Sequence, residues 1–308
     1  MRLQIYREAP VSRSSVFERG YRVLRLPLAY VFVLAIAPLL HAADAPYFVT
    51  YSHKMEEPGN LELASNEVIG APKGGNTFLN TLLEFEYGVK TWWTAELYLS
   101  GQSTRHQGSV FTGYRIENRF RLLPREHWIN PVLYVEWVDV NEADKSLREV
   151  VGHDTFESQL APNDETRHER KHEAEVKLIL SSNLKGWNIS ENIIAEKNLN
   201  NSPWEFGYAL GVSRPLALKA KPNRCFACAE NFRAGVEMYG GLGDRHSFGL
   251  HDTSHYLAPT IAWVLPNNTT LEFSTGFGLN DNSHGVLWRF TVAHEINQFA
   301  RLLRARFH

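Results

Sequence analysis

One segment of this 308-residue sequence gathers the residue types of a hydrolytic site. Between Gly243 and His255 lie His246, Ser247, His251, Asp252, Ser254 and His255. A Ser-His-Asp triad is defined by geometry and roles, so sequence spacing neither requires nor excludes one here. The three histidines could also bind a metal ion. A polar surface loop without chemistry is the third interpretation.

A second segment, His168 to His172, spells H-E-x-x-H. In zinc proteases this motif lies on a helix, which places both histidines on one face with the glutamate as base. The residues before it, 162–166, have the composition of a loop, and Glu173 to Leu180 alternates like a strand. Without a helix the two histidines do not face one zinc ion. We therefore expect a solvated charged rim and no metal site.

The two cysteines, Cys225 and Cys228, form a C-x-x-C pair. Ala229 stands where covalent haem attachment requires histidine. The sequence places no further zinc ligands nearby and no thioredoxin-like βαβ unit around the pair. In an oxidising compartment a local disulfide is the expected state, with metal binding as the alternative. No cofactor is predicted.

Composition restricts the folds that can position these residues. The chain is 44% hydrophobic and 12% aromatic, with a formal net charge of -2. This aromatic content argues against disorder. After the N-terminal region no uncharged apolar run reaches the roughly 20 residues of a transmembrane helix, which excludes a polytopic helical protein. A near-neutral charge gives no reason to expect nucleic acid as a partner.

The N-terminal region has the three parts of a secretory signal peptide. Several arginines precede the apolar run Leu26 to Leu40, and Ala42 and Ala43 follow it. Residues 1–43 are therefore predicted to be a signal peptide cleaved near Ala43, with an uncleaved anchor as the alternative. Residues 44–58 are then expected to be a periplasmic N-terminal segment.

From Gly59 onward, the hydrophobic pattern has the period of two that a pleated strand with two different faces requires. In the segment 286–296, for example, Val286, Trp288 and Phe290 alternate with Leu287 and Arg289. The alternation predicts twelve strands, at residues 60–69, 77–88, 91–101, 109–122, 129–141, 169–182, 186–198, 203–215, 229–241, 255–265, 269–279 and 286–296.

Strand length and connection length favour a membrane barrel over a soluble sandwich. The predicted strands are long enough for a tilted bilayer crossing of about 9 to 11 residues. Short connections mostly alternate with longer ones, as in single-chain outer-membrane barrels; the segment Leu216 to Cys228 breaks this rule. Residues 142–168 are the best candidate for a loop that folds into or over the pore. Aromatic residues expected in two interfacial girdles are Trp92, Trp93, Trp128, Trp187, Trp204, Tyr256, Trp263 and Trp288.

The predicted fold class is therefore all-β, a transmembrane antiparallel up-and-down β-barrel of about 12 strands at residues 59–296, followed by a basic C-terminal tail at 297–308. Three C-terminal segments, Tyr256 to Leu265, Leu271 to Asp281 and Trp288 to Ile296, resemble the end of outer-membrane β-barrels of the phenol-degradation MetA-pathway type. The resemblance implies a porin-like transport or channel protein without assigned catalytic residues. The arginine-rich tail after the last strand departs from the aromatic terminal residue that such barrels commonly carry.

Arg or Lys on the lipid-facing side of a barrel costs roughly 2 to 4 kcal/mol at the bilayer midplane, so the charged residues are expected inside. This predicts a narrow, charge-lined lumen that passes small solutes, or ion pairs that only hold the barrel together. The alternatives are an outer-membrane hydrolase at 242–255 and a plugged structural barrel. Expected partners are outer-membrane lipid, the barrel-assembly machinery and a small-molecule solute. The predicted lumen-lining residues are Glu84, Glu86, Glu96, Arg115, Glu117, Arg119, Arg121, Glu136, Glu173, Glu175, Lys177, Glu205, Arg233, Glu237, Glu272, Arg289 and Glu295.

Overall fold

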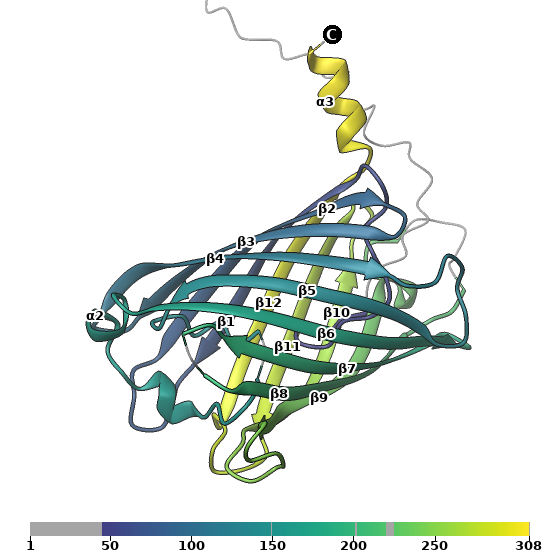
Figure 1. The fold of residues 1–308 in the computed structure, drawn as a ribbon. Coiled ribbons are helices and arrows are strands. Elements are labelled where there is room, and N and C mark those ends of the chain that lie inside the picture. The colour runs from purple at the N-terminus through teal and green to yellow at the C-terminus, as the bar shows by residue number, and fades with distance from the viewer. Residues whose placement is uncertain (1–44, 149, 201, 220–224, 308) are drawn as a thin grey trace, which may run out of the picture. The chain divides into compact units, whose positions relative to one another are not determined.

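The computed structural model describes residues 45–148, 150–200, 202–219 and 225–307. The expected signal peptide, residues 1–43, lies outside the described residues. Every strand pairs antiparallel with its neighbours along the chain, and β1 pairs with β12, so the sheet closes on itself (Figure 1). The strands are β1 (Leu61–Gly70), β2 (Phe78–Lys90), β3 (Trp93–Thr104), β4 (Gly108–Arg121), β5 (Asn130–Asn141), β6 (Arg170–Leu184), β7 (Trp187–Asn198), β8 (Trp204–Pro215), β9 (Phe232–Asp244), β10 (His255–Val264), β11 (Thr269–Gly278) and β12 (Val286–Ile296).

This topology confirms the predicted up-and-down barrel with twelve strands in the described part of the chain. Most strand limits lie within two or three residues of the predicted ones. β9 is the clearest shift, because Ala229–Asn231 form a short 3-10 turn, η2, before the strand begins at Phe232. We call the end at which β1 begins and β12 ends the terminal end, and the opposite end the loop end.

The two faces of the sheet differ in polarity in the manner of a membrane protein. On β2, the side chains of Leu79, Leu83 and Phe85 are exposed on the outside, whereas Asn80 and Glu86 are buried inside. A soluble barrel has the reverse arrangement, with apolar residues inside. Apolar outward faces recur around the barrel, and closure leaves no unpaired strand edge, which a bilayer requires. Within the described residues, no helix is both long and apolar enough to cross a membrane.

Aromatic side chains gather at the terminal end. Trp92 and Trp93 stack with Phe120 next to the β2–β3 turn, and Trp263 packs against Phe232 at the β9–β10 edge. Trp204 and Trp288 lie at or near the beginning of β8 and β12, close to the loop end. The assignment of Tyr256 to a girdle is wrong, because the even-numbered residues of β10 face inward and Tyr256 is buried.

Two segments that are not strands enter the barrel. Residues 45–60, which precede β1, contact inward-facing side chains of β4 and of β6 to β9. Residues 45–58, the described part of the segment expected in the periplasm, therefore lie against the inner wall of the barrel. The physical reason is that wall side chains such as Glu237 and Asn192 bind the polar main-chain groups of this segment.

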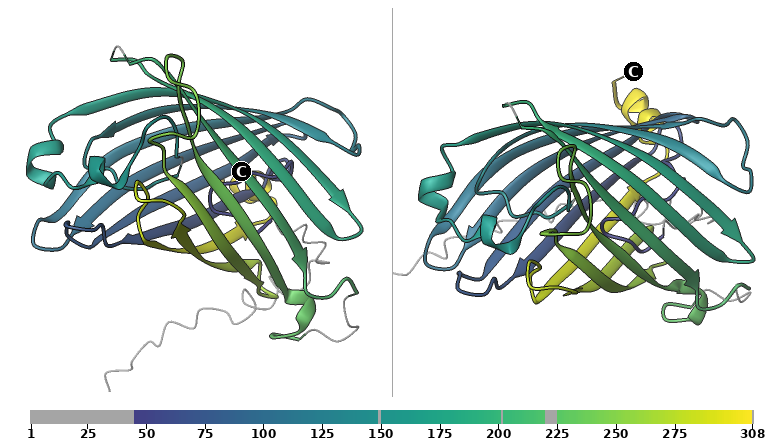
Figure 2. Two further views of the ribbon diagram at one scale, coloured as in Figure 1. Left: turned by 90° about the horizontal axis from the view of Figure 1, so that it is seen from below. Right: turned by 60° about the horizontal axis from the view of Figure 1, so that its bottom comes forward.

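The second segment is the β5–β6 loop, residues 142–169, which contains η1 (Phe156–Gln159) and α2 (Asn163–Thr166). These two short helical turns lie at the end of the barrel opposite the C-terminal helix (Figure 2). The first part of the β5–β6 loop folds inward, since Ala143, Lys145 and Ser146 are buried. The basic tail forms α3 (Phe299–Phe307) just after β12, and the Ala300 amide donates to the Gly59 carbonyl.

Small residues make room for both segments. A Cβ atom on Gly211 of β8 would lie 2.6 Å from the ring of Tyr47, and one on Gly207 would lie 2.7 Å from the carbonyl oxygen of Val150. At β8 the two glycines therefore leave space on the inner wall for Tyr47 of the N-terminal segment and Val150 of the β5–β6 loop. The sequence pattern identified Gly207 and Gly211 only as one face of a strand.

Candidate functional site

The inner wall carries a row of glutamates that face each other across neighbouring strands. Each member is the direct register partner of the next. In order around the barrel from β12 through β1 to β8, the row is Glu295, Glu62, Glu86, Glu96, Glu117, Glu136, Glu175, Glu196 and Glu205.

This glutamate row runs from one end of the barrel to the other. Glu62 is the second residue of β1, at the terminal end, and Glu205 is the second residue of β8, at the loop end. Register partners lie across the strands, and strands in closed barrels tilt by roughly 35–45° from the barrel axis. A line of partners therefore climbs along the axis as it passes around the wall.

Basic side chains contact part of the row. The guanidinium of Arg119 binds Glu86 and Glu96, and its Nε lies 3.4 Å from a Glu117 carboxylate oxygen. On β6, Lys177 Nζ lies 2.8 Å from Glu175 Oε1, in a position fully shielded from solvent. Arg148 Nη2 also lies 3.5 Å from a Glu117 carboxylate oxygen. Like charges directly opposite each other destabilise a sheet, and these cations offset that repulsion where they contact the row.

The predicted interior residues all belong to strands, but they differ in burial. Ten are buried: Glu86, Glu96, Arg115, Glu117, Arg119, Glu136, Glu175, Lys177, Glu237 and Arg289. Seven are half-buried: Glu84, Arg121, Glu173, Glu205, Arg233, Glu272 and Glu295. Two members of the row, Glu62 and Glu196, were not predicted. Their inward parity was available from the alternation of their strands, but the row itself depends on strand register.

The side chain of Glu237 on β9 binds main-chain groups of the N-terminal segment. Its Oε1 accepts the Phe48 amide at 3.1 Å, and its Oε2 accepts the amides of Val49 and Thr50 at 3.1 and 3.0 Å. Successive amides that converge on one anion form a nest. Hydrogen bonds to a charged group contribute about 1.5 to 3 kcal/mol each.

Asn192 of β7 continues the same cradle. Its Oδ1 accepts the Tyr51 amide at 2.6 Å, and its Nδ2 donates to the Tyr51 carbonyl at 2.9 Å. The Tyr51 hydroxyl donates to Glu117, which is a member of the glutamate row. The N-terminal segment therefore lies against the row inside the barrel.

The β5–β6 loop meets the N-terminal segment from the loop end. Arg148 of this loop bonds the Tyr51 hydroxyl and stacks on the ring of Tyr98 at 4.0 Å. Nearer the loop end, Arg115 of β4 binds the loop through Ser146 at 3.0 Å. The two segments together form an interior plug, which we define as residues 45–58, 142–148 and 150–151.

A buried histidine holds the later part of this loop. His284, in the β11–β12 connection, donates from Nε2 to Gln159 Oε1 at 2.9 Å, and its ring packs edge-on against Phe78 and Phe156. Burial, with a smaller effect of nearby Lys145, lowers the pKa of His284 to about 4. Burial also lowers the pKa of Lys145.

The segment 243–255 does not assemble a triad. His246, Ser247 and His251 are exposed, and the Ser254 hydroxyl lies within hydrogen-bond distance of two main-chain carbonyls. His255 lies between Tyr208 Oη at 3.1 Å and Thr253 Oγ1 at 2.8 Å, but Thr253 is fully buried. No serine of this segment bonds a histidine among the interactions of the described residues.

The H-E-x-x-H segment is not helical. α2 ends at Thr166 and β6 begins at Arg170, so His168 lies in the turn and His172 in the strand, where it stacks on Trp137. Among the described residues, the set of carboxylate, histidine or cysteine groups close enough to share an ion is Glu84, Glu86 and Glu96, within 4.8 Å. Arg119 already binds two of these carboxylates, and we assign no metal here.

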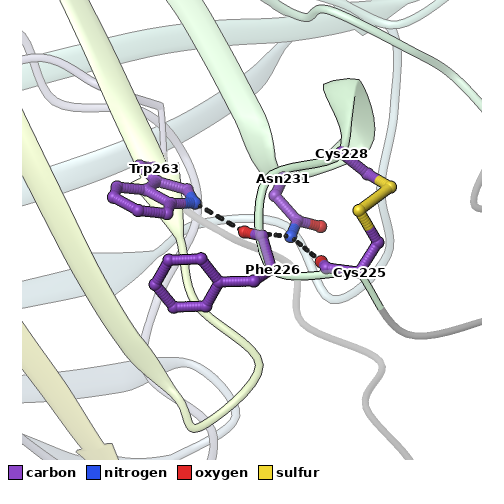
Figure 3. The surroundings of a disulfide bond; sticks show 5 residues. All are labelled: Cys225, Phe226, Cys228, Asn231 and Trp263. Atoms are coloured by element: carbon purple, nitrogen blue, oxygen red, sulfur yellow. Dashed lines mark hydrogen bonds between the residues drawn. A yellow bond between two sulfur atoms is a disulfide. The ribbon is translucent and has the colours of Figure 1, made fainter.

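Cys225 and Cys228 are joined by a disulfide in the β8–β9 connection (Figure 3). Asn231 Nδ2 donates to the carbonyls of Cys225 and Phe226. Trp263 Nε1 on β10 donates to the Phe226 carbonyl at 2.9 Å, and the two rings pack edge-on. The disulfide thus closes a short loop that is fixed to the outer face of the barrel at its terminal end.

Comparison with known proteins found similar solved structures but no related sequence. No family model and no curated protein matches the chain. Among solved structures it is similar to KdgM porin (TM-score 0.45, 5% identity, covering 76% of this chain and 98% of that chain), NanC porin (0.42, 11%, 77% and 100%) and LpxR from Salmonella typhimurium (0.40, 11%, 76% and 99%). At these values the likeness assigns no activity. The class defined by the structure itself is a closed, membrane-spanning, porin-like β-barrel.

Proposed function

We propose that the protein is an outer-membrane channel that passes small, positively charged solutes along the glutamate row. The observation that carries the proposal is the register itself, because it links facing carboxylates on nine neighbouring strands between the two ends of the barrel. Rings or tracks of acidic side chains favour cations in a narrow pore. In this proposal the interior plug obstructs the path in the resting conformation.

The cellular setting belongs to the same proposal. Single-chain barrels of this kind with an even strand number occur in bacterial outer membranes, with both termini on the periplasmic side. Export by a signal peptide at 1–43, insertion by the barrel-assembly machinery and membership of the MetA-pathway type of barrel are parts of the proposal. A hydrolase built around His255 is the second candidate, favoured by the hydrogen-bonded chain Tyr208, His255 and Thr253. The burial of Thr253 disfavours it.

The test is ion selectivity in planar bilayers. Glu196 and Glu191 lie on the same strand, β7, but Glu196 is in the row and buried, whereas Glu191 is exposed on the outer face. We expect Glu196→Gln to lower the preference for K⁺ over Cl⁻, measured as the reversal potential in a KCl gradient. The matched substitution Glu191→Gln should leave the reversal potential unchanged.

Two outcomes would contradict the channel. One is anion selectivity in the wild-type protein. The other is the absence of conductance both in the wild type and in variants with a released plug, which would establish the plugged structural barrel instead.

A further inference from the structure

The cradle that holds the N-terminal segment recognises main chain more than side chains. Residues 48–51 are bound through four amide N–H groups and one carbonyl, by Glu237 and Asn192. By contrast, the Thr50 hydroxyl has no hydrogen-bond partner, and Val49 only packs in an apolar cluster. A ligand with the same main-chain groups and other side chains at these positions could make the same hydrogen bonds.

The two wall residues of the cradle are shielded from solvent when the segment is bound. Glu237 is 1% exposed and Asn192 is 0% exposed, so their hydrogen bonds to the segment do not compete with water. A carboxylate that accepts three successive amides and a carboxamide that pairs with both groups of one residue are complementary to a bent peptide.

The charge of the surrounding wall adds no preference. The cradle adjoins the glutamate row, since Tyr51 bonds Glu117. The resident segment carries a lysine, Lys54, whose carbonyl accepts a hydrogen bond from Arg119. Arg119, Arg148 and Lys177 also lie over the Tyr51 ring, so the wall beside the cradle carries charges of both signs and the main-chain hydrogen bonds set the ligand class.

We propose that this cradle is a peptide-binding site inside the barrel and that its ligands are short peptides recognised through their main chain, with residues 47–55 as the resident intramolecular ligand. The inference deepens the proposed channel function, because the site lies beside the proposed cation path. A tethered ligand has a high effective concentration and excludes free peptide. Binding from solution is therefore visible only when the resident segment is weakened.

The test uses the full-length protein in detergent micelles with Val49→Pro and Thr50→Pro combined. Proline has no amide hydrogen, so the resident segment loses two bonds to Glu237 while the wall stays unchanged. The probe is a fluorescent nonapeptide with the sequence of residues 47–55, YFVTYSHKM, followed by anisotropy. Its control is the same peptide N-methylated at the residues corresponding to Val49 and Thr50.

We expect the double-proline variant to bind the probe at least tenfold more tightly than the wild type does, and the methylated peptide to bind at least tenfold more weakly. Adding Glu237→Gln to the variant should weaken probe binding about tenfold. The matched substitution Thr50→Ala, which keeps the amide and removes only the unpartnered hydroxyl, should behave as the wild type.

A folded, heat-modifiable double-proline variant that does not bind the probe, or that binds both peptides equally, would overturn the proposal. If that variant does not fold, Tyr47→Ala releases the segment by removing its contact with Gly211, and the same outcomes apply. The two proposals fail separately. Peptide binding in a barrel without conductance would contradict the channel proposal alone. A cation-selective channel that binds no peptide would contradict the peptide-site proposal alone.

Discussion

At the residue scale, Gly211 decides whether Tyr47 fits inside the barrel. Its strand conformation accepts other residues, but a Cβ atom there would meet the tyrosine ring at 2.6 Å. We expect Gly211→Val to displace Tyr47, to loosen the interior plug and to raise the open probability in single-channel recordings. Combining it with Tyr47→Ala removes the clash but also the ring that fills this space.

The control for this steric effect is another strand glycine. A Cβ on Gly101 of β3 would approach no atom closer than 3.9 Å, so Gly101→Val should leave the open probability unchanged. Equal effects at Gly101 and Gly211 would show that strand glycines, and not the fit of Tyr47, control opening.

His284 makes the seating of the β5–β6 loop depend on pH. Its pKa is about 4 in the folded loop and about 6.5 in an exposed chain, so the neutral form is the one that the structure stabilises. This contribution is complete above pH 6.5 and is lost as the pH falls from 6.5 through 4. A difference of about 2.5 pKa values corresponds to at most roughly 3 kcal/mol.

We therefore expect the β5–β6 loop to become more sensitive to limited proteolysis at pH 4.5 than at pH 7. In His284→Gln this part of the pH dependence should disappear, since glutamine does not titrate. Identical pH profiles for both proteins would show that carboxylates of the loop, and not His284, control the change.

Individual residues were predictable only as far as the face on which they lie. The period of two placed Glu86, Arg119 and Lys177 on one face of their strands, where the structure has them buried. It could not show that Glu86 faces Glu96, because parity contains no information on register. Nor could it show that Thr253 is buried, which decides against the triad at His255.

At the scale of the element, the strands were the predictable part. Each has two chemically different environments, lipid outside and polar interior inside, and this difference forces alternation on the sequence. Residues 45–60 have no such repeat, because side-chain cradles and not a ladder hold their main chain. The β5–β6 loop was expected to fold into or over the pore, but its contact with Tyr51 through Arg148 required the three-dimensional arrangement.

At the scale of the whole molecule, the glutamate row sets stability against selectivity. Glu136 faces Glu117 and Glu175 and accepts a hydrogen bond from Tyr134, which a glutamine can also accept. Like charges that face each other across strands destabilise the sheet. We expect Glu136→Gln to raise the temperature at which the barrel unfolds, measured by gel mobility after heating, and to lower cation preference in the same protein.

The outer-face substitution Glu191→Gln is the control for selectivity here too, with no expected change in cation preference. A lower unfolding temperature for Glu136→Gln would mean that interactions of the Glu136 carboxylate with its partners outweigh the repulsion. The row would then serve to stabilise the barrel.

The β1–β12 seam also fixes an order of events during biogenesis. The N-terminal segment is joined directly to β1, and β1 is the strand that meets the last one synthesised, β12. Until that pairing forms, the wall is an open sheet and the segment can settle on it laterally. Pairing of β12 with β1 then encloses the segment, so a segment that docks on the open sheet never has to thread through a formed lumen.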